Sequence, residues 1–98
     1  MDLEALKAAL RREASPDGLS LALQALWHQA KGNWDRAHAL AQAQSDADGA
    51  WVHAYLHRVE GDEGNAGYWY RNAGRPHSHA PLDIEWEEIA AALLKAQR

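Results

Sequence analysis

A turn motif that occurs twice, with similar flanking residues, constrains the fold of this chain more than any other feature. The two copies, ALWHQAKGNWDRA at residues 25–37 and AYLHRVEGDEGNA at residues 54–66, start 29 residues apart. In each copy a glycine is followed by Asn or Asp. Glycine readily takes the left-handed conformation that ends a helix, and Asn and Asp are good N-caps for the next one. The motif therefore predicts one helical hairpin used twice.

The composition favours helices along the whole chain. Hydrophobic residues make up 47% of the 98 residues, and many of them are alanine or leucine, whereas the chain has two Val, two Ile and no Thr. Because strands are built mainly from β-branched and aromatic residues, little material is available for a sheet. We predict a single all-α domain of about six helices, in which N- and C-terminal helices flank the two hairpins.

Capping residues and the spacing of apolar residues place the helix boundaries. The first helix is predicted from Asp2 to about residue 14. Ser15 as N-cap and Pro16 as first helical residue then begin a helix that continues to about residue 31. Further helices are expected at about 34–43, 51–60 and 63–73, and Asp83 is the predicted N-cap of a last helix that ends near residue 97. The acidic residues 85–88 are interpreted as a solvent-exposed helix start.

The two copies resemble tetratricopeptide repeats at the small and aromatic positions of that family. The matching residues are Ala54, Gly61, Ala66, Tyr70 and Ala73 in the second copy, and Ala25, Gly32, Trp34 and Ala37 in the first. The resemblance covers about residues 18–76. It implies stacked helical hairpins and, by analogy, a protein-binding role.

The chain also departs from the tetratricopeptide pattern, because its repeat is shorter than the usual length of about 34 residues. Ala41 and Glu63 stand where that family prefers an aromatic residue, and Gln44 stands where it prefers Ala. Residues 61–76 also resemble a signature of small uncharacterised bacterial proteins, G-D-x-x-N-A-x-Y-W-Y-R-x-A-G-R-P. This second likeness implies no function.

Charge and composition exclude several classes of partner. The formal net charge is −4, whereas nucleic-acid-binding domains and proteins that adsorb to anionic membranes present basic surfaces. Cysteine is absent, which excludes disulfides and thiolate chemistry. The first ten residues lack the basic flank and apolar run of a signal peptide, and no segment has the length of a membrane span. We expect a cytoplasmic protein without nucleic-acid or membrane partners.

Four histidines are candidate metal ligands. His53 and His57 lie four residues apart, so both imidazoles share one face of a helix, with Glu60 one turn further on. His77 and His79, in the loop before the last helix, are candidates to complete the site. Alternatively, these side chains only pack or form hydrogen bonds, since His57 matches a histidine of the first copy. We favour packing and predict no metal or other cofactor.

Aromatic and arginine side chains of the second hairpin are candidate binding residues: Trp51, Tyr55, Tyr68, Arg71 and Arg75. The arginines, four residues apart, suit an anion or a peptide carboxylate, or else they pair with acidic residues at positions 60–63. Trp51 and Tyr55 either line a groove between the hairpins or fill the core. Five tryptophans are difficult to bury fully in so small a domain, so one or two partly exposed ones are expected to mark an interface.

No motif for catalysis stands out, since the sequence has no Gly-rich phosphate loop, nucleophile elbow or catalytic pair of carboxylates. We therefore interpret the chain as a non-enzymatic protein- or peptide-binding module or assembly module. Its partner is another protein or a second copy in a homodimer, recognised as a helix or peptide in a groove. The rival hypothesis is a small metal-binding protein or enzyme that uses His53 and His57.

Overall fold

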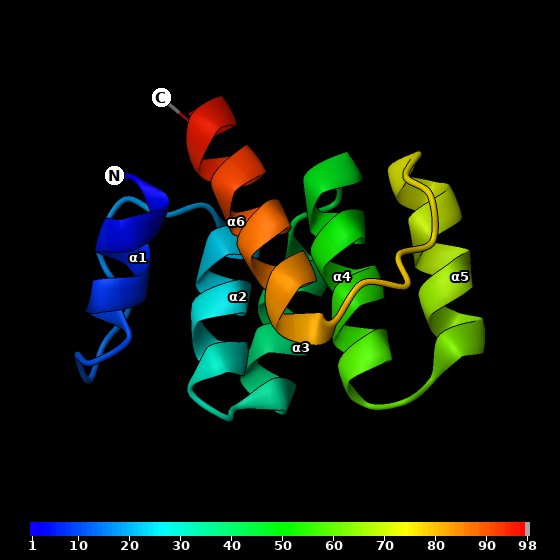
Figure 1. Ribbon diagram of the computed structural model, residues 1–98, viewed down its shortest axis with the longest axis horizontal. Helices are drawn as coiled ribbons and strands as arrows, with labels where there is room; N and C mark the ends of the chain where they lie inside the picture. The colour runs from blue at the N-terminus through cyan, green and yellow to red at the C-terminus, as the bar shows by residue number, and fades with distance from the viewer. Residues whose placement is uncertain (98) are drawn as a thin grey trace.

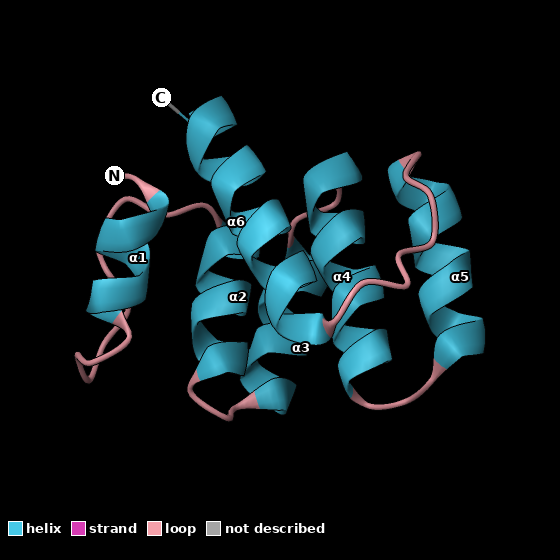
Figure 2. Ribbon diagram, in the orientation of Figure 1, coloured by secondary structure: helices cyan, strands magenta, loops and turns pink. Residues whose placement is uncertain are grey.

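The computed structural model describes residues 1–97, which form six helices and no strand (Figures 1 and 2). The predicted all-α class is confirmed. In chain order the helices are α1 Leu3–Ala9, α2 Leu21–Ala30, α3 Trp34–Ala43, α4 Ala47–Val59, α5 Glu63–Ala73 and α6 Leu82–Gln97. None of the described helices is both long and apolar enough to cross a bilayer.

The α2–α3 and α4–α5 hairpins turn in the same way. Gly32 and Gly61 have φ angles of 87° and 85°. The N–H groups of the next residues, Asn33 and Asp62, donate to carbonyls five residues earlier at 2.9 and 2.8 Å. Both side chains then accept an N–H three residues later, each at 3.1 Å. This combination closes the first helix and caps the second, as the repeat predicts.

Small residues at matched positions of the hairpins lie in the core. Ala25 and Ala54, and likewise Ala37 and Ala66, are completely inaccessible to solvent. With only a methyl group at these positions, the paired helices approach closely and larger side chains fill the remaining space. The chain therefore uses one packing solution twice.

Helix α6 crosses over the face formed by α2 and α4, and α1 and α5 lie at opposite ends of the molecule (Figure 1). The indole Nε1–H of Trp86 on α6 donates to the carbonyl of Leu26 on α2 at 2.9 Å. The other buried apolar side chains of α6 are Ile89, Ala90, Leu93 and Leu94. The chain thus covers the inner face of its own hairpins.

The first helix is shorter than predicted, because the carbonyl groups at and after its end accept hydrogen bonds from side chains at the end of α2. Trp27 Nε1–H donates to Ala9 O at 3.1 Å, and Lys31 Nζ donates to Leu10 O and Arg12 O at 2.6 and 2.9 Å. An ammonium group favours the negative end of a helix dipole, so Lys31 stabilises the end of α1. Nothing in residues 1–14 indicates that side chains from another helix will bond to these carbonyl groups.

The predicted start of α2 is wrong. Ser15 is not the N-cap, because Gly18 has a φ of 84°, which no right-handed helix that begins at Pro16 could contain. The N-cap is Ser20, whose Oγ accepts the N–H of Leu23 at 3.2 Å. Residues 16–18 therefore form a turn.

The last helix begins two residues earlier than predicted, at Leu82. The carbonyl of Pro81 accepts the N–H of Glu85 at 3.0 Å, which is the first bond of the helical pattern. Asp83 therefore lies inside the first turn and is not the N-cap. Proline fits at such a helix start because its missing N–H is not needed there.

Candidate functional site

Three histidines meet in the furrow between α3 and α5, above α4. His38 comes from α3, and His53 and His57 come from successive turns of α4; we call these residues the histidine cluster. Each contributes one ring nitrogen, and the three nitrogens lie within 4.8 Å of one another. Only 3% of His53 and 8% of His57 is exposed, and His38 is half-buried. Helices α3 and α5 both pack against α4 and thereby enclose this face.

Two tryptophans form the walls of the histidine cluster. The Trp34 ring stacks on His38 with centroids 4.8 Å apart, and the Trp69 ring stacks on His53 at 3.9 Å. Trp34 is held in place by its Nε1–H, which donates to Leu56 O at 2.7 Å. These are the two partly exposed tryptophans of the chain. The expected pair of partly exposed tryptophans therefore lies beside the histidine cluster, and their role at an interface stays a prediction.

Burial keeps two of these imidazoles neutral near pH 7. Removal from water, together with the neighbouring His38 and His57, lowers the pKa of His53 to about 4. Burial, followed by the charge of His57, also lowers the pKa of His38, although Glu60 and Asp35 act against that shift. A neutral imidazole has a free lone pair, so it can accept a proton or bind a metal.

The buried position of His53 predicts a loss of stability in acid for the metal-free protein. The unfolded chain protonates His53 near pH 6.5 and the folded chain near pH 4, so the unfolded state binds more protons between these values. We expect the unfolding free energy to fall by up to about 3 kcal/mol from pH 7 to pH 4. Urea titrations in EDTA across this range measure it.

A matched variant isolates the contribution of His53 to the acid profile. His53→Gln keeps a polar side chain of similar size without a titratable ring, so its unfolding free energy should change less between pH 7 and pH 4. Profiles of equal slope for the variant and the parent protein would contradict the assignment to His53.

His57 also bonds to Glu60, at 2.5 Å between Nδ1 and Oε1. His77 and His79 do not join the histidine cluster. His77 Nε2 instead lies 2.8 Å from Glu63 Oε1, and its ring stacks on Tyr70 and on His79. The loop that carries His77 and His79 packs against α5 and α6.

Sequence reasoning missed His38, which completes the histidine cluster. The available signal was Trp34 four residues earlier, because residues i and i+4 share a helix face. The spacing of Trp34 and His38 could not show that their shared face of α3 packs against α4.

The candidate binding residues of the second hairpin fall into two groups. Trp51 and Tyr55 are 8% and 2% exposed and fill the core, which was one of the two alternatives for them. Tyr68 is 50% exposed on the outer side of α5, and Arg71 and Arg75 are exposed too. The predicted ion pairs with residues 60–63 do not form: within residues 1–97 neither arginine pairs with an acidic group. The Arg75 guanidinium stacks 3.7 Å from the Trp51 ring centroid.

No protein-family model, curated protein or solved structure shows a significant match to this chain. The resemblance to tetratricopeptide repeats therefore stays a prediction. Any functional argument has to come from the residues and their geometry.

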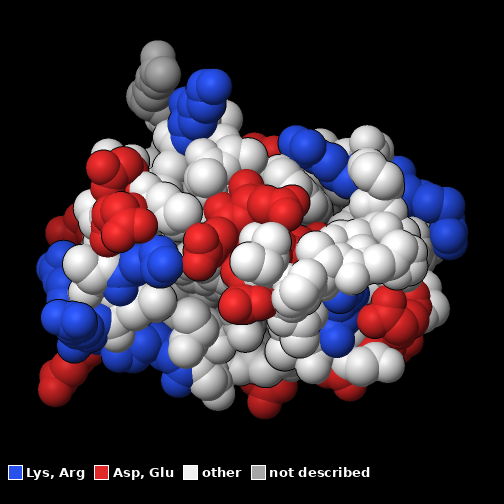
Figure 3. Space-filling view, viewed as in Figure 1, with Lys and Arg blue, Asp and Glu red and all other residues white. Residues whose placement is uncertain are grey.

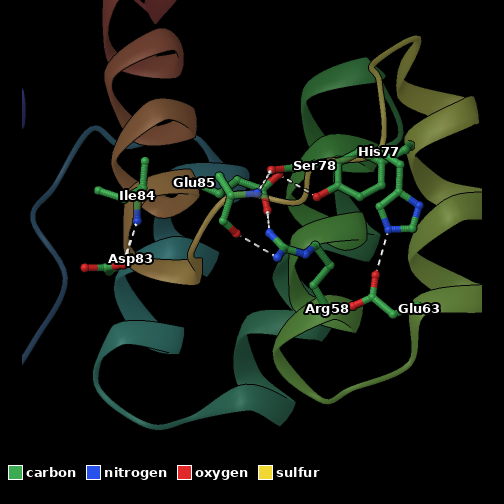
Figure 4. A network of polar contacts seen from close by, with 9 residues as sticks. Arg58, Glu63, His77, Ser78, Asp83, Ile84 and Glu85 are labelled. Atoms are coloured by element: carbon green, nitrogen blue, oxygen red, sulfur yellow. Dashed lines mark hydrogen bonds and ion pairs between the residues drawn. The ribbon is translucent and has the colours of Figure 1, made fainter.

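A second cluster of polar side chains, formed by Arg58, Tyr70 and Glu85, is buried between α4, α5 and α6 (Figure 4). Glu85, interpreted from the sequence as solvent-exposed, is only 2% exposed. Its Oε1 accepts from Arg58 Nη1 at 2.6 Å and its Oε2 accepts from the Tyr70 hydroxyl at 2.5 Å. Arg58 Nη2 also donates to Ala80 O at 2.8 Å. This buried network fastens the start of α6 to the second hairpin.

Proposed function

We propose that this chain is a non-enzymatic, cytoplasmic module that binds an acidic segment of a protein or peptide through the outer face of α5. The observation that carries the proposal is that Tyr68 and Arg71 on α5 and Arg75 in the turn after it are exposed, while neither arginine has an acidic partner within residues 1–97. Exposed aromatic and arginine side chains dominate the binding energy of many protein interfaces.

The position of α6 favours α5 as the binding element. Recognition of a helix or peptide in the groove over α2 and α4 would require removal of α6, which the buried Arg58–Glu85 pair fastens in place. Helix α5 packs mainly against α4 and lies at one end of the molecule, so its outer face is free (Figure 1). A partner that binds this face needs no rearrangement of the fold.

The charge distribution favours an acidic partner. The whole chain is acidic, and Arg71 and Arg75 place two guanidinium groups at the end of α5 and in the turn after it, although Figure 3 shows Lys and Arg side chains at the α1 end of the molecule as well. The Arg75 guanidinium lies 3.7 Å from the Trp51 ring centroid, and a guanidinium group can bind both oxygens of a carboxylate.

The test combines affinity capture with a charge-matched control. A Strep-tagged bait retains partners from native lysate, and the purified pair is then titrated to obtain Kd. We expect Arg71→Ala/Arg75→Ala to weaken binding at least about tenfold, since hydrogen bonds to charged groups contribute about 1.5–3 kcal/mol. The control, Arg11→Ala/Arg12→Ala, removes the same charge from exposed residues near α1 and should leave Kd unchanged.

Two results would contradict the proposal. One is equal loss of binding in both double variants, which would indicate a general charge effect. The other is a bait that captures only itself. Light scattering at micromolar concentration would then measure whether the partner is a second copy of the chain, because a homodimer would have twice the monomer mass.

A further inference from the structure

We propose that His38, His53 and His57 bind one divalent transition-metal ion, of which zinc fits best. The inference is independent of the proposed binding face, because the histidine cluster lies in the furrow between α3 and α5. It also changes the ligand set suggested by the sequence, since His38 takes the place of the His77/His79 loop.

The distances between the ring nitrogens allow a single ion. Three points within 4.8 Å of one another fit in a circle of about 2.8 Å radius. A central ion therefore draws each nitrogen inward by about 0.7 Å to reach the Zn–N distance of about 2.0–2.1 Å. Small side-chain rotations supply such a shift, and no helix has to move.

The hydrogen bond between His57 and Glu60 suits metal binding as well. The Glu60 carboxylate lies 2.5 Å from Nδ1 of His57, so the proposal assigns Nε2 of His57 as the atom that binds the ion. A carboxylate behind a ligating histidine is a recurrent feature of metal sites, because it fixes the tautomer and orients the ring.

The tryptophan walls hold two ligands in position before the ion binds. Trp34 stacks on His38 and Trp69 stacks on His53, with ring planes inclined by only 14° and 11°. Preorganised rings lose little rotational freedom on binding, which favours affinity. A set of three imidazoles without thiolate suits Zn²⁺, Cu²⁺, Ni²⁺ or Co²⁺ better than Mg²⁺ or Ca²⁺.

A fourth ligand position is available to solvent. A cavity of about 400 Å³ between α3, α4 and α5 is lined by His53, Trp69 and Asn72, among others. Of the three histidines only His53 lines this cavity, so the proposal places the open coordination position on the side of His53. Three protein nitrogens with an open fourth position is an arrangement that zinc adopts in proteins.

The test uses the full chain with a C-terminal Strep tag, stripped of metal with EDTA and then dialysed. Titration with Co²⁺ alone gives a visible d–d spectrum that reports coordination geometry, and competition with Zn²⁺ gives the zinc affinity. We expect one equivalent per chain. His38→Ala, at the half-buried ligand, should weaken binding at least about 100-fold, whereas His79→Ala, outside the histidine cluster, should leave it unchanged.

A second readout does not depend on the folding of any variant. In imidazole ¹⁵N spectra of the unmodified protein, zinc should shift the ring nitrogens of three of the six histidines. The proposal is overturned if no Co²⁺ or Zn²⁺ binds at 1:1, if His38→Ala and His79→Ala bind equally, or if the shifted resonances belong to His77 and His79.

Discussion

Gly49→Ala should destabilise the fold by at least about 3 kcal/mol, although it adds a single methyl group. Gly49 lies in the first turn of α4, where the backbone of α4 passes directly over the end of α3. A Cβ at this position would overlap the carbonyl oxygen of Gln44 and lie 3.0 Å from that of Ala41. Both obstacles are backbone atoms, so no side chain can rotate away.

The overlap would also disrupt the polar contacts of this junction. The N–H of Gly49 donates to the N-cap Asp46 at 2.9 Å, and the Gln44 side chain accepts the N–H of Ala22 at 2.8 Å. Separation of α3 from α4 weakens both bonds. It also moves His38 away from the two histidines of α4, so the variant should bind metal more weakly than the parent protein.

Gly64→Ala is the matched control for Gly49→Ala. Gly64 lies in the first turn of α5, where the nearest atom to an added Cβ is the Asp62 carboxylate oxygen at 3.8 Å, an ordinary contact. Alanine is favoured over glycine in a helix by about 0.5–1 kcal/mol, so this variant should be slightly more stable than the parent. Urea unfolding followed by circular dichroism measures both, and equal effects would contradict the steric account.

The features that the sequence predicted well are those that depend on neighbouring residues. A glycine followed by a capping residue specifies the same turn at Gly32 and at Gly61, because the required backbone angles and hydrogen bonds involve only a few consecutive positions. Alanines at matched positions predicted close helix contacts in the same way. The number of helices and the two hairpins follow from these local rules.

The features that sequence reasoning missed depend on contacts between distant segments. The start of α2 is the exception, because a local turn at Gly18, three residues after Ser15, sets it at a later residue. Glu85 has the pattern of an exposed helix start, yet it is buried by the crossing of α6 over α4, which no residue near it specifies. His38 joins the histidine cluster only because α3 packs against α4.

The second large effect is expected from Glu85→Ala, which should cost about 3–5 kcal/mol, because it leaves a buried cation without its counter-charge. The Arg58 side chain is only 11% exposed and pairs with the Glu85 carboxylate at 2.6 Å. Tyr70 loses its hydrogen-bond acceptor at the same time. Burial, followed by the bond to Glu85, raises the pKa of Tyr70, so its hydroxyl remains a donor at neutral pH and needs that acceptor.

The control for Glu85→Ala lies half a turn away on the same helix. Glu87 pairs with Lys7 at 3.1 Å, but both side chains are 41% exposed, so Glu87→Ala should cost no more than about 1 kcal/mol. Replacement of both partners, as Arg58→Met/Glu85→Met, should recover much of the loss, since buried pairs are often replaced by apolar residues at little cost.

Unfolding in urea measures all three variants, and tryptophan fluorescence, to which Trp86 on α6 contributes, reports the loss of packing. Equal stability of Glu85→Ala and Glu87→Ala would contradict the importance of the buried network. A double variant no more stable than Glu85→Ala would instead show that the polar contacts themselves, and not merely the filled volume, hold α6 in place. In either case the result measures how much the buried network contributes to holding α6 over α2 and α4.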